Sequence, residues 1–175
     1  GKWPPDHKLL ALAAEMTPEK VAPLCYGPAV SPHLAARMAG EDIDPAGLVA
    51  HAREQPERTV VVEGVGGLLV PLAEDYSVRD LAVELGMPLV LAASPGLGTI
   101  NHTLLTIEAA RVAGLNVAAV VLTPWPTEPS RMELSNQETI ERLGGVACES
   151  IERLPAGDLK ALAIAGAALP WCDWL

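Results

Sequence analysis

The sequence predicts an α/β fold in which a parallel sheet is flanked by helices. Three short runs of β-branched or apolar residues indicate buried strands, and they lie at residues 59–62, 88–93 and 117–122. Stretches with helical spacing separate these runs, at residues 78–85 and 101–113. Strands that alternate with helices are typical of a parallel sheet.

Five further segments show helical spacing or helix start signals. They cover residues 8–15, 32–39, 45–54, 130–143 and 159–168. Ser31 and Asp44 stand where N-caps of two of these helices are expected, and Ser77 and Gly114 bound the two helices between the strands. Because no internal repeat or linker is found, residues 1–175 are expected to form a single domain.

Composition excludes several classes of protein. Hydrophobic residues make up 50% of the chain, but no uncharged apolar run approaches the roughly 20 residues of a membrane-spanning helix. The first residues are not followed by the apolar stretch of a secretory signal. Cys25, Cys148 and Cys172 are odd in number and lack paired histidines, which argues against a disulfide framework or a zinc site. We therefore expect a cytoplasmic protein with reduced thiols.

The formal net charge of -10 argues against nucleic-acid binding, because the few basic residues are scattered and the phosphate backbone would be repelled. An acidic protein can still bind a nucleotide locally. Backbone amides, a lysine and a metal ion then offset the like charge.

Candidate site residues follow the predicted strands, since ligands of open parallel sheets bind at the carboxyl ends of the strands. Glu63 comes directly after three valines, where a magnesium ion bound to phosphate would sit. The glycines that follow, from Gly64 to Gly67, would let a ligand approach the backbone closely. The alternative is a glycine turn with a solvated glutamate.

The second strand leads into Gly98, Thr99, Ile100 and Asn101, which open a helix. Unpaired amides and the positive end of the helix dipole make such a start suitable for a carboxylate or phosphate. Thr99 or Asn101 could equally cap the helix. His102 could be a catalytic base, although a lone histidine there is more often a structural hydrogen-bonding group.

The phosphate-binding pattern of two glycines followed by lysine and serine or threonine does not occur in the sequence. Gly66 and Gly67 are followed by Leu68, with no lysine nearby. From the residues alone, the prediction therefore ends at a parallel α/β domain with a magnesium carboxylate and an anion-binding helix start.

Three segments together resemble the dethiobiotin synthetase family. They read SPHLAA at residues 31–36, EGVGGLLVPL at 63–72 and LGTINHTLLT at 97–106, in matching order and spacing. The resemblance runs from about Asp6 to about Leu154. It implies a P-loop NTPase-like sheet and a homodimer that makes dethiobiotin from 7,8-diaminopelargonic acid, CO2 and ATP with Mg2+. A carbamate forms first, then a carbamic-phosphoric anhydride, and the second amine closes the ring.

The resemblance also assigns residues of the site. Glu63 matches a magnesium-binding glutamate, and Asp6 resembles a partner aspartate that touches metal and nucleotide, with helix capping as the alternative for Asp6. Gly64, Val65 and Gly66 match a loop that borders the nucleotide, with Val65 in place of the more usual alanine.

Further segments would contact the substrate and the base. The helix start that receives the substrate carboxylate, in known members from across the dimer interface, matches Leu97, Gly98, Thr99, Ile100 and Asn101. Ser31 and Pro32 match a segment near the substrate, with capping as the alternative for Ser31. The nucleotide-contacting positions match Thr123, Pro124, Glu152, Arg153 and Leu154.

Two departures from the family pattern bear on the nucleotide. The P-loop and the family's lysines would lie before Gly1, so no catalytic residue is assigned within the sequence. Thr123 stands where an asparagine usually reads adenine, and a hydroxyl cannot reproduce the paired donor and acceptor of an amide. Another nucleoside triphosphate could thus replace ATP. The alternatives are a non-catalytic binding or regulatory module without the P-loop, and a cobalamin-pathway amide ligase, for whose glutaminase domain there is no room.

Overall fold

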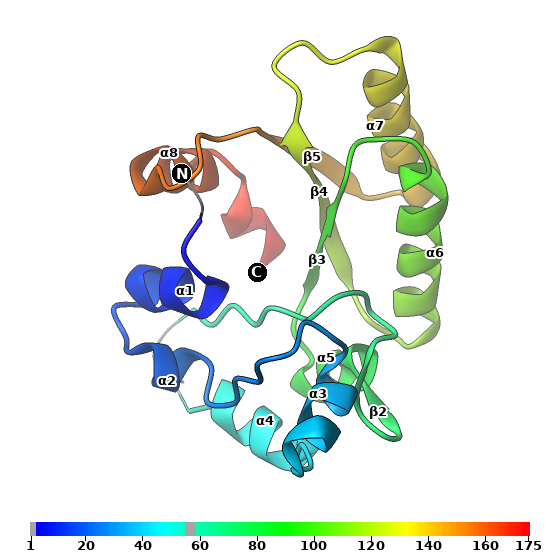
Figure 1. Ribbon diagram of the computed structural model, residues 1–175. Coiled ribbons are helices and arrows are strands. Elements are labelled where there is room, and N and C mark those ends of the chain that lie inside the picture. The colour runs from blue at the N-terminus through cyan, green and yellow to red at the C-terminus, as the bar shows by residue number, and fades with distance from the viewer. Residues whose placement is uncertain (1–2, 55–58) are drawn as a thin grey trace.

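The computed structural model describes residues 3–54 and 59–175. Its centre is a parallel sheet with the strand order β3-β4-β5, formed by β3 (Leu89–Ala93), β4 (Val117–Trp125) and β5 (Ala147–Glu152). Helices α6 (Thr99–Val112) and α7 (Arg131–Gly144) connect these strands and lie together on one side of the sheet (Figure 1). The expected α/β fold with a parallel sheet is therefore confirmed.

The main hydrophobic core lies between this sheet and the two helices. Leu122 and Val120 of β4 are fully buried there with Ile140 of α7, and Ile107 of α6 packs into the same cluster. A continuous apolar strand such as β4 is what a strand covered on both sides requires. The core thus fixes the sheet and both helices relative to one another.

A second group of elements lies below the sheet in Figure 1. It comprises α3 (Pro32–Ala39), α4 (Pro45–Ala52), the short antiparallel pair β1 (Pro71–Ala73) and β2 (Tyr76–Ser77), and α5 (Val78–Leu85). Its smaller core consists of Val49, Leu72 and Leu81. These elements lead the chain into β3.

The remaining helices lie on the side of the sheet opposite α6 and α7 (Figure 1). They are α1 (Asp6–Ala14), α2 (Pro18–Val21), α8 (Leu159–Ala167) and the 3-10 helix η1 (Trp171–Trp174). In the described part of the chain, no helix combines the length and apolar character needed to span a membrane.

Helix capping follows the local signals in the sequence. The Asp44 carboxylate accepts hydrogen bonds from the amides of Ala46 and Gly47 at the start of α4. Ser77 and Asp80 form a capping box on α5, and Ser130 begins α7 with a second one. Ser31 occupies the N-cap of α3 but its side chain makes no cap hydrogen bond.

The strand expected at residues 59–62 is wrong for this structure. The segment forms no strand, and the side chain of Val61 is 86% exposed. A β-branched run becomes a strand only when a neighbouring strand satisfies its backbone, and β4 is the one strand that pairs with β3 among the described residues. Conversely, β5, β1, β2 and α2 were not expected from the sequence.

Candidate functional site

The connection between β3 and α6 presents the start of α6 at the carboxyl end of the sheet. Gly98 is the N-cap and adopts a left-handed backbone with φ of 91°, which favours glycine. The amide of His102 donates to the Gly98 carbonyl at 3.1 Å and closes the first helical turn. Leu97 is 94% exposed. The residue before the N-cap therefore lies at the surface.

Neither Thr99 nor Asn101 caps this helix. Both lie inside the first turn, and the N-cap has no side-chain hydrogen bond. Thr99 is buried, and its hydroxyl lies 3.4 Å from that of Thr103. Asn101 and His102 are exposed. Exposure leaves Asn101 available to a ligand, whereas the Thr99 side chain is buried and its amide already donates to the Gly96 carbonyl.

Asn136 of α7 is hydrogen-bonded to the same connection on its buried side. Its side chain is 8% exposed, and its amide nitrogen donates to the carbonyl oxygens of Pro95 at 2.9 Å and Gly96 at 3.4 Å. The sequence analysis did not find this residue. Its only local feature is a polar position on the apolar face of a helix, four residues before Ile140.

The ends of β4 and β5 bring two predicted nucleotide-contacting segments together. Thr123 and Pro124 lie near the end of β4, and the next residue, Trp125, is paired with Glu152 in β5. The amide of Arg153 donates to the Trp125 carbonyl at 2.9 Å. Residues 123–124 and 152–154 are therefore neighbours at the carboxyl edge of the sheet.

The segment that carries Glu63 does not extend the sheet. Glu63 is exposed and follows an unpaired segment, so the expected place at the carboxyl end of a strand is not observed. Gly64 packs against α5, because a Cβ atom there would lie 2.7 Å from Cγ1 of Val78. Gly66 has φ of 77°. Close packing and a tight turn thus account for these two glycines, and Val65 beside them is exposed.

Asp6 is the first residue of α1 and is exposed. Pro5 is the N-cap residue, and no side-chain cap hydrogen bond is present, so the capping alternative for Asp6 is not observed. Among the described residues, no group of three or more His, Cys, Asp or Glu side chains is arranged to hold a metal ion.

The three cysteines are not joined in disulfides. Cys25 and Cys172 are exposed and Cys148 is buried. Burial raises the pKa of the Cys148 thiol to about 11. This thiol therefore stays protonated at neutral pH.

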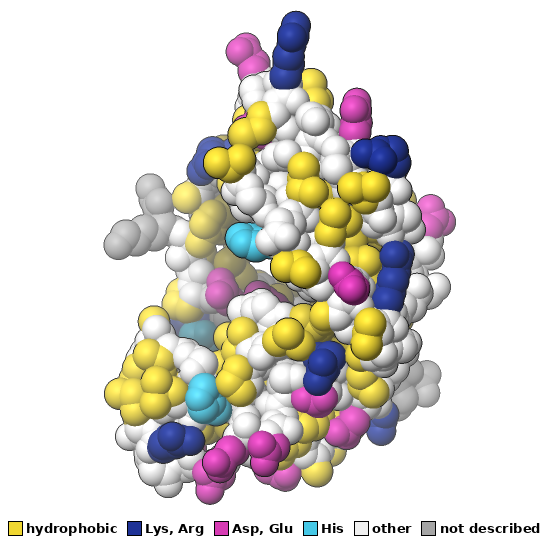
Figure 2. Space-filling model, turned by 90° about the vertical axis from the view of Figure 1, so that its right-hand side faces the viewer, with side chains coloured by type: hydrophobic (Ala, Val, Ile, Leu, Met, Phe, Trp, Pro, Cys, Tyr) yellow, Lys and Arg dark blue, Asp and Glu magenta, His cyan; other side chains and the backbone are white. Residues whose placement is uncertain are grey.

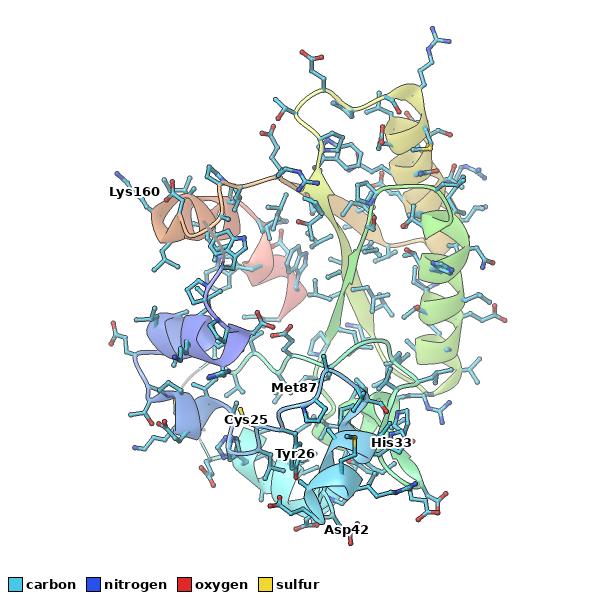
Figure 3. All side chains as sticks on the ribbon, viewed as in Figure 1. Cys25, Tyr26, His33, Asp42, Met87 and Lys160 are labelled. Atoms are coloured by element: carbon cyan, nitrogen blue, oxygen red, sulfur yellow. The ribbon has the colours of Figure 1, made fainter. Side chains whose placement is uncertain are left out.

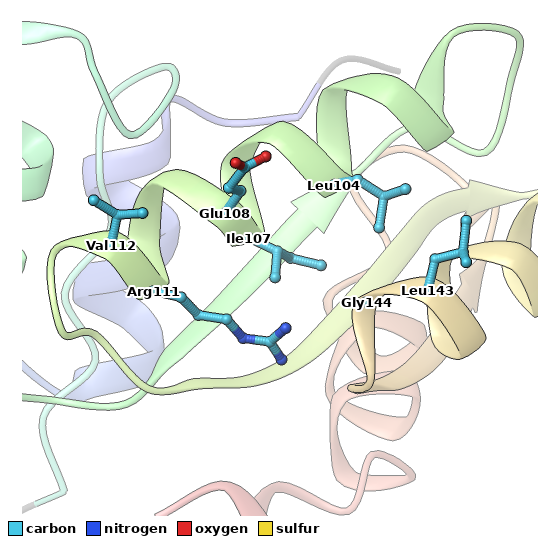
Figure 4. A pocket seen from close by; sticks show the side chains of 7 residues that line it. All are labelled: Leu104, Ile107, Glu108, Arg111, Val112, Leu143 and Gly144. Carbon is cyan, nitrogen blue, oxygen red and sulfur yellow. The ribbon is translucent and has the colours of Figure 1, made fainter.

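Two hollows mark the surface away from these segments. A groove of about 310 Å³ lies between α6 and α7, and its lining includes Arg111 and Leu104 of α6 and Leu143 of α7 (Figure 4). A hollow of about 340 Å³ lies next to α3 and is lined by residues that include His33 and Asp42 (Figure 3). Neither hollow contains a residue that the sequence analysis assigned to the site.

Comparison with known proteins identifies the family. The family model described as "AAA domain" matches residues 6–155. The chain belongs to the AAA domain family. The match supports the P-loop NTPase-like fold class, since the parallel sheet of this structure falls within it.

Curated relatives named "ATP-dependent dethiobiotin synthetase BioD" are similar to most of the chain. The protein of Bacillus licheniformis is 38% identical over 145 residues, which are 81% of this chain and 62% of the relative. That of Mycolicibacterium vanbaalenii is 38% identical over 144 residues (80% and 58%), and that of Anaeromyxobacter dehalogenans 42% over 127 residues (71% and 57%). The resemblance to dethiobiotin synthetases is confirmed. The chain spans about three fifths of the length of these relatives.

Proposed function

We propose that the protein carrying this chain is an ATP-dependent dethiobiotin synthetase. It would use ATP and CO2 to convert 7,8-diaminopelargonic acid into dethiobiotin through a carbamate and a carbamic-phosphoric anhydride. The observation that carries the proposal is the similarity to dethiobiotin synthetases, which covers 81% of the chain for the Bacillus licheniformis protein.

The start of α6 is proposed to bind the carboxylate of the diamine, through Leu97, Gly98, Thr99, Ile100 and Asn101. The first amides of a helix carry partial positive charge, and a carboxylate placed there is stabilised. The exposure of Leu97 and Asn101 supports access of a ligand to this turn. The reacting amines would then lie away from the helix, at a distance set by the length of the substrate chain.

The adjacent ends of β4 and β5 are proposed to bind the base of the nucleotide, through Thr123, Pro124, Glu152, Arg153 and Leu154. Their proximity supports one shared subsite. A threonine hydroxyl cannot both donate to and accept from the adenine edge as an amide does. We therefore propose that the selection of ATP over other nucleoside triphosphates is relaxed.

Asp6 and Glu63 are proposed to hold Mg2+, and Gly64, Val65 and Gly66 to border the nucleotide. Two exposed carboxylates are a donor set that suits a hard cation. The ion would neutralise charge on the transferring phosphoryl group. The protein's own part in such a transfer is to position the carbamate oxygen and exclude water.

A homodimer that acts in the cytoplasm is part of the proposal. The side of the molecule formed by α6 and α7 exposes several apolar side chains (Figure 2). They include Leu105, Val112, Leu134 and Leu143. Apolar side chains on one face support association with a second copy, which would bring the start of α6 to the partner's substrate.

The decisive experiment is turnover by the full protein that carries this sequence. It is incubated with 7,8-diaminopelargonic acid, bicarbonate, Mg2+ and ATP, CTP or GTP, and both phosphate and dethiobiotin are measured. We expect phosphate release that depends on the diamine, with more than one nucleotide accepted. Absence of dethiobiotin with all three nucleotides would refute the proposed function.

The role of Glu63 is tested by Glu63→Gln. Removing the charge of a metal ligand should lower kcat by about a hundredfold or more and shift the Mg2+ dependence to higher concentration. Glu74→Gln is the matched control, since Glu74 is an exposed glutamate in the turn between β1 and β2. Activity of Glu63→Gln near that of the control would reject the metal role.

A further inference from the structure

The side chain of Asn136 links α7 to the connection between β3 and α6. One amide nitrogen donates to two consecutive carbonyl oxygens, those of Pro95 and Gly96, across 41 and 40 residues of sequence. The bond to Pro95 is buried and the bond to Gly96 is partly buried, so an unsatisfied amide at Asn136 would be costly. The Asn136 amide therefore has a structural role in the interior and is not a solvent-facing polar group.

The two carbonyl groups lie immediately before the start of α6. The Gly96 carbonyl also accepts the amide hydrogen of Thr99 at 3.2 Å, the first residue of the helix. Two residues lie between Gly96 and Thr99: Leu97 is exposed, and Gly98 has the left-handed backbone described above. A glycine-containing connection loses much conformational freedom when it is ordered. A hydrogen bond from a buried side chain on a packed helix supplies that order.

We propose that Asn136 is a positioning residue for the substrate carboxylate. By fixing Pro95 and Gly96 to α7, it holds the first amides of α6 in the orientation that receives the anion. The inference rests on the proposed function, because it requires that the start of α6 binds the diamine's carboxylate. If these amides shift by a fraction of an ångström, their hydrogen bonds to the substrate carboxylate become weaker.

Gln137 provides a matched control on the same helix. Its amide nitrogen donates to the Cys148 carbonyl at 2.7 Å and is also partly buried, but this bond ties α7 to β5 instead of to the connection before α6. Loss of either amide removes a side-chain to backbone hydrogen bond from α7. Only the loss of Asn136 releases the start of α6.

The experiment measures binding of two ligands by the full protein in the presence of nucleotide and Mg2+. The ligands are 7,8-diaminopelargonic acid and 2,3-diaminononane, in which a methyl group replaces the carboxylate. For Asn136→Ala we expect about tenfold weaker binding of the acid and unchanged binding of the carboxylate-free diamine. Gln137→Ala should bind both ligands as the wild type does. Asn136→Ser, which keeps a donor, is used if Asn136→Ala does not fold, with an intermediate loss for the acid alone.

The outcomes separate this inference from the proposed function. Unchanged binding of the acid, or an equal loss for both diamines, would overturn the positioning role. The same selective loss in Gln137→Ala would overturn it as well, because that result reflects general loosening of α7. A wild-type protein that binds neither diamine would overturn the proposed function itself and this inference with it.

Discussion

Replacing Ile140 by alanine should remove much of the stability of the molecule. Ile140 is fully buried between α7 and the sheet. The substitution deletes three carbon atoms, whose transfer from water contributes about 2.5 kcal/mol. The cavity left behind raises the expected loss in the free energy of unfolding to about 3–4 kcal/mol. That is a large fraction of the 5–15 kcal/mol that is typical of native proteins.

The same substitution on α8 is the control. Ile164 is 63% exposed, so only about a third of the transfer term is lost, and alanine is the better helix former by a few tenths of a kcal/mol. We expect Ile164→Ala to cost at most about 0.5 kcal/mol. Urea unfolding followed by circular dichroism gives both values. Equal losses for the two variants would refute the packing of α7 on the sheet, and with it the rigid base from which Asn136 reaches Pro95.

Three further substitutions test the substrate site and a helix cap. Asn101→Ala should raise the KM for the diamine several-fold while changing the free energy of unfolding by less than about 0.5 kcal/mol, since Asn101 is exposed and makes no cap; an unchanged KM would count against its role. Ser77→Ala should lower stability by about 1 kcal/mol at pH 7. The hydrogen bond from the Ser77 side chain is the main cause that lowers the pKa of Asp80. The ionised Asp80 carboxylate therefore stabilises the folded state above its unfolded pKa near 4, and this contribution is lost as the pH falls through the lower folded pKa. Asp80→Asn should therefore be less stable than the wild type at pH 7 and nearly equal to it at pH 2; the same deficit at both pH values would contradict the pKa shift.

Local signals were sufficient to predict the longer helices, although not the four-residue helix α2. Asp44 and Ser77 bond to amides two or three residues away, so the information lies within one turn of the chain. Strands β3 and β4 were predictable because their residues form continuous apolar runs. Ser31 occupies the predicted N-cap position of α3, but its side chain makes no cap hydrogen bond. The sequence thus predicted where the helix begins without predicting that the cap hydrogen bond forms.

Strand β5 was missed because its sequence lacks an apolar run. Ala147–Glu152 reads ACESIE and forms one edge of the sheet, where it pairs only with β4 among the described residues. An edge strand buries less of its surface, so polar residues such as Glu149 are tolerated. Residues 59–62 present the opposite case. Their composition favours a strand, but strand formation depends on a partner, which composition does not specify.

The candidate site also has parts that the sequence predicts and parts that it does not. Because the carboxyl ends of parallel strands share one edge, the chain order of strands and helices is sufficient to predict that residues 97–101 and 123–124 lie at that edge. Residues 152–154 lie at the end of the unexpected strand β5, and only the family resemblance assigned them. The two groups at the ends of β4 and β5 are the ones whose contact depends on strand pairing. The structure places these two groups beside each other through the pairing of Trp125 with Glu152. What the order of elements cannot predict is the orientation of each connection. Asn136 sets that orientation for the start of α6 from about 40 residues away, and its sequence neighbours give no indication that a buried amide on α7 faces Pro95. The topology thus determines the sheet edge at which the site lies. The orientation of the side chains and amides at that edge depends on contacts between residues far apart in the sequence, which only the folded structure shows.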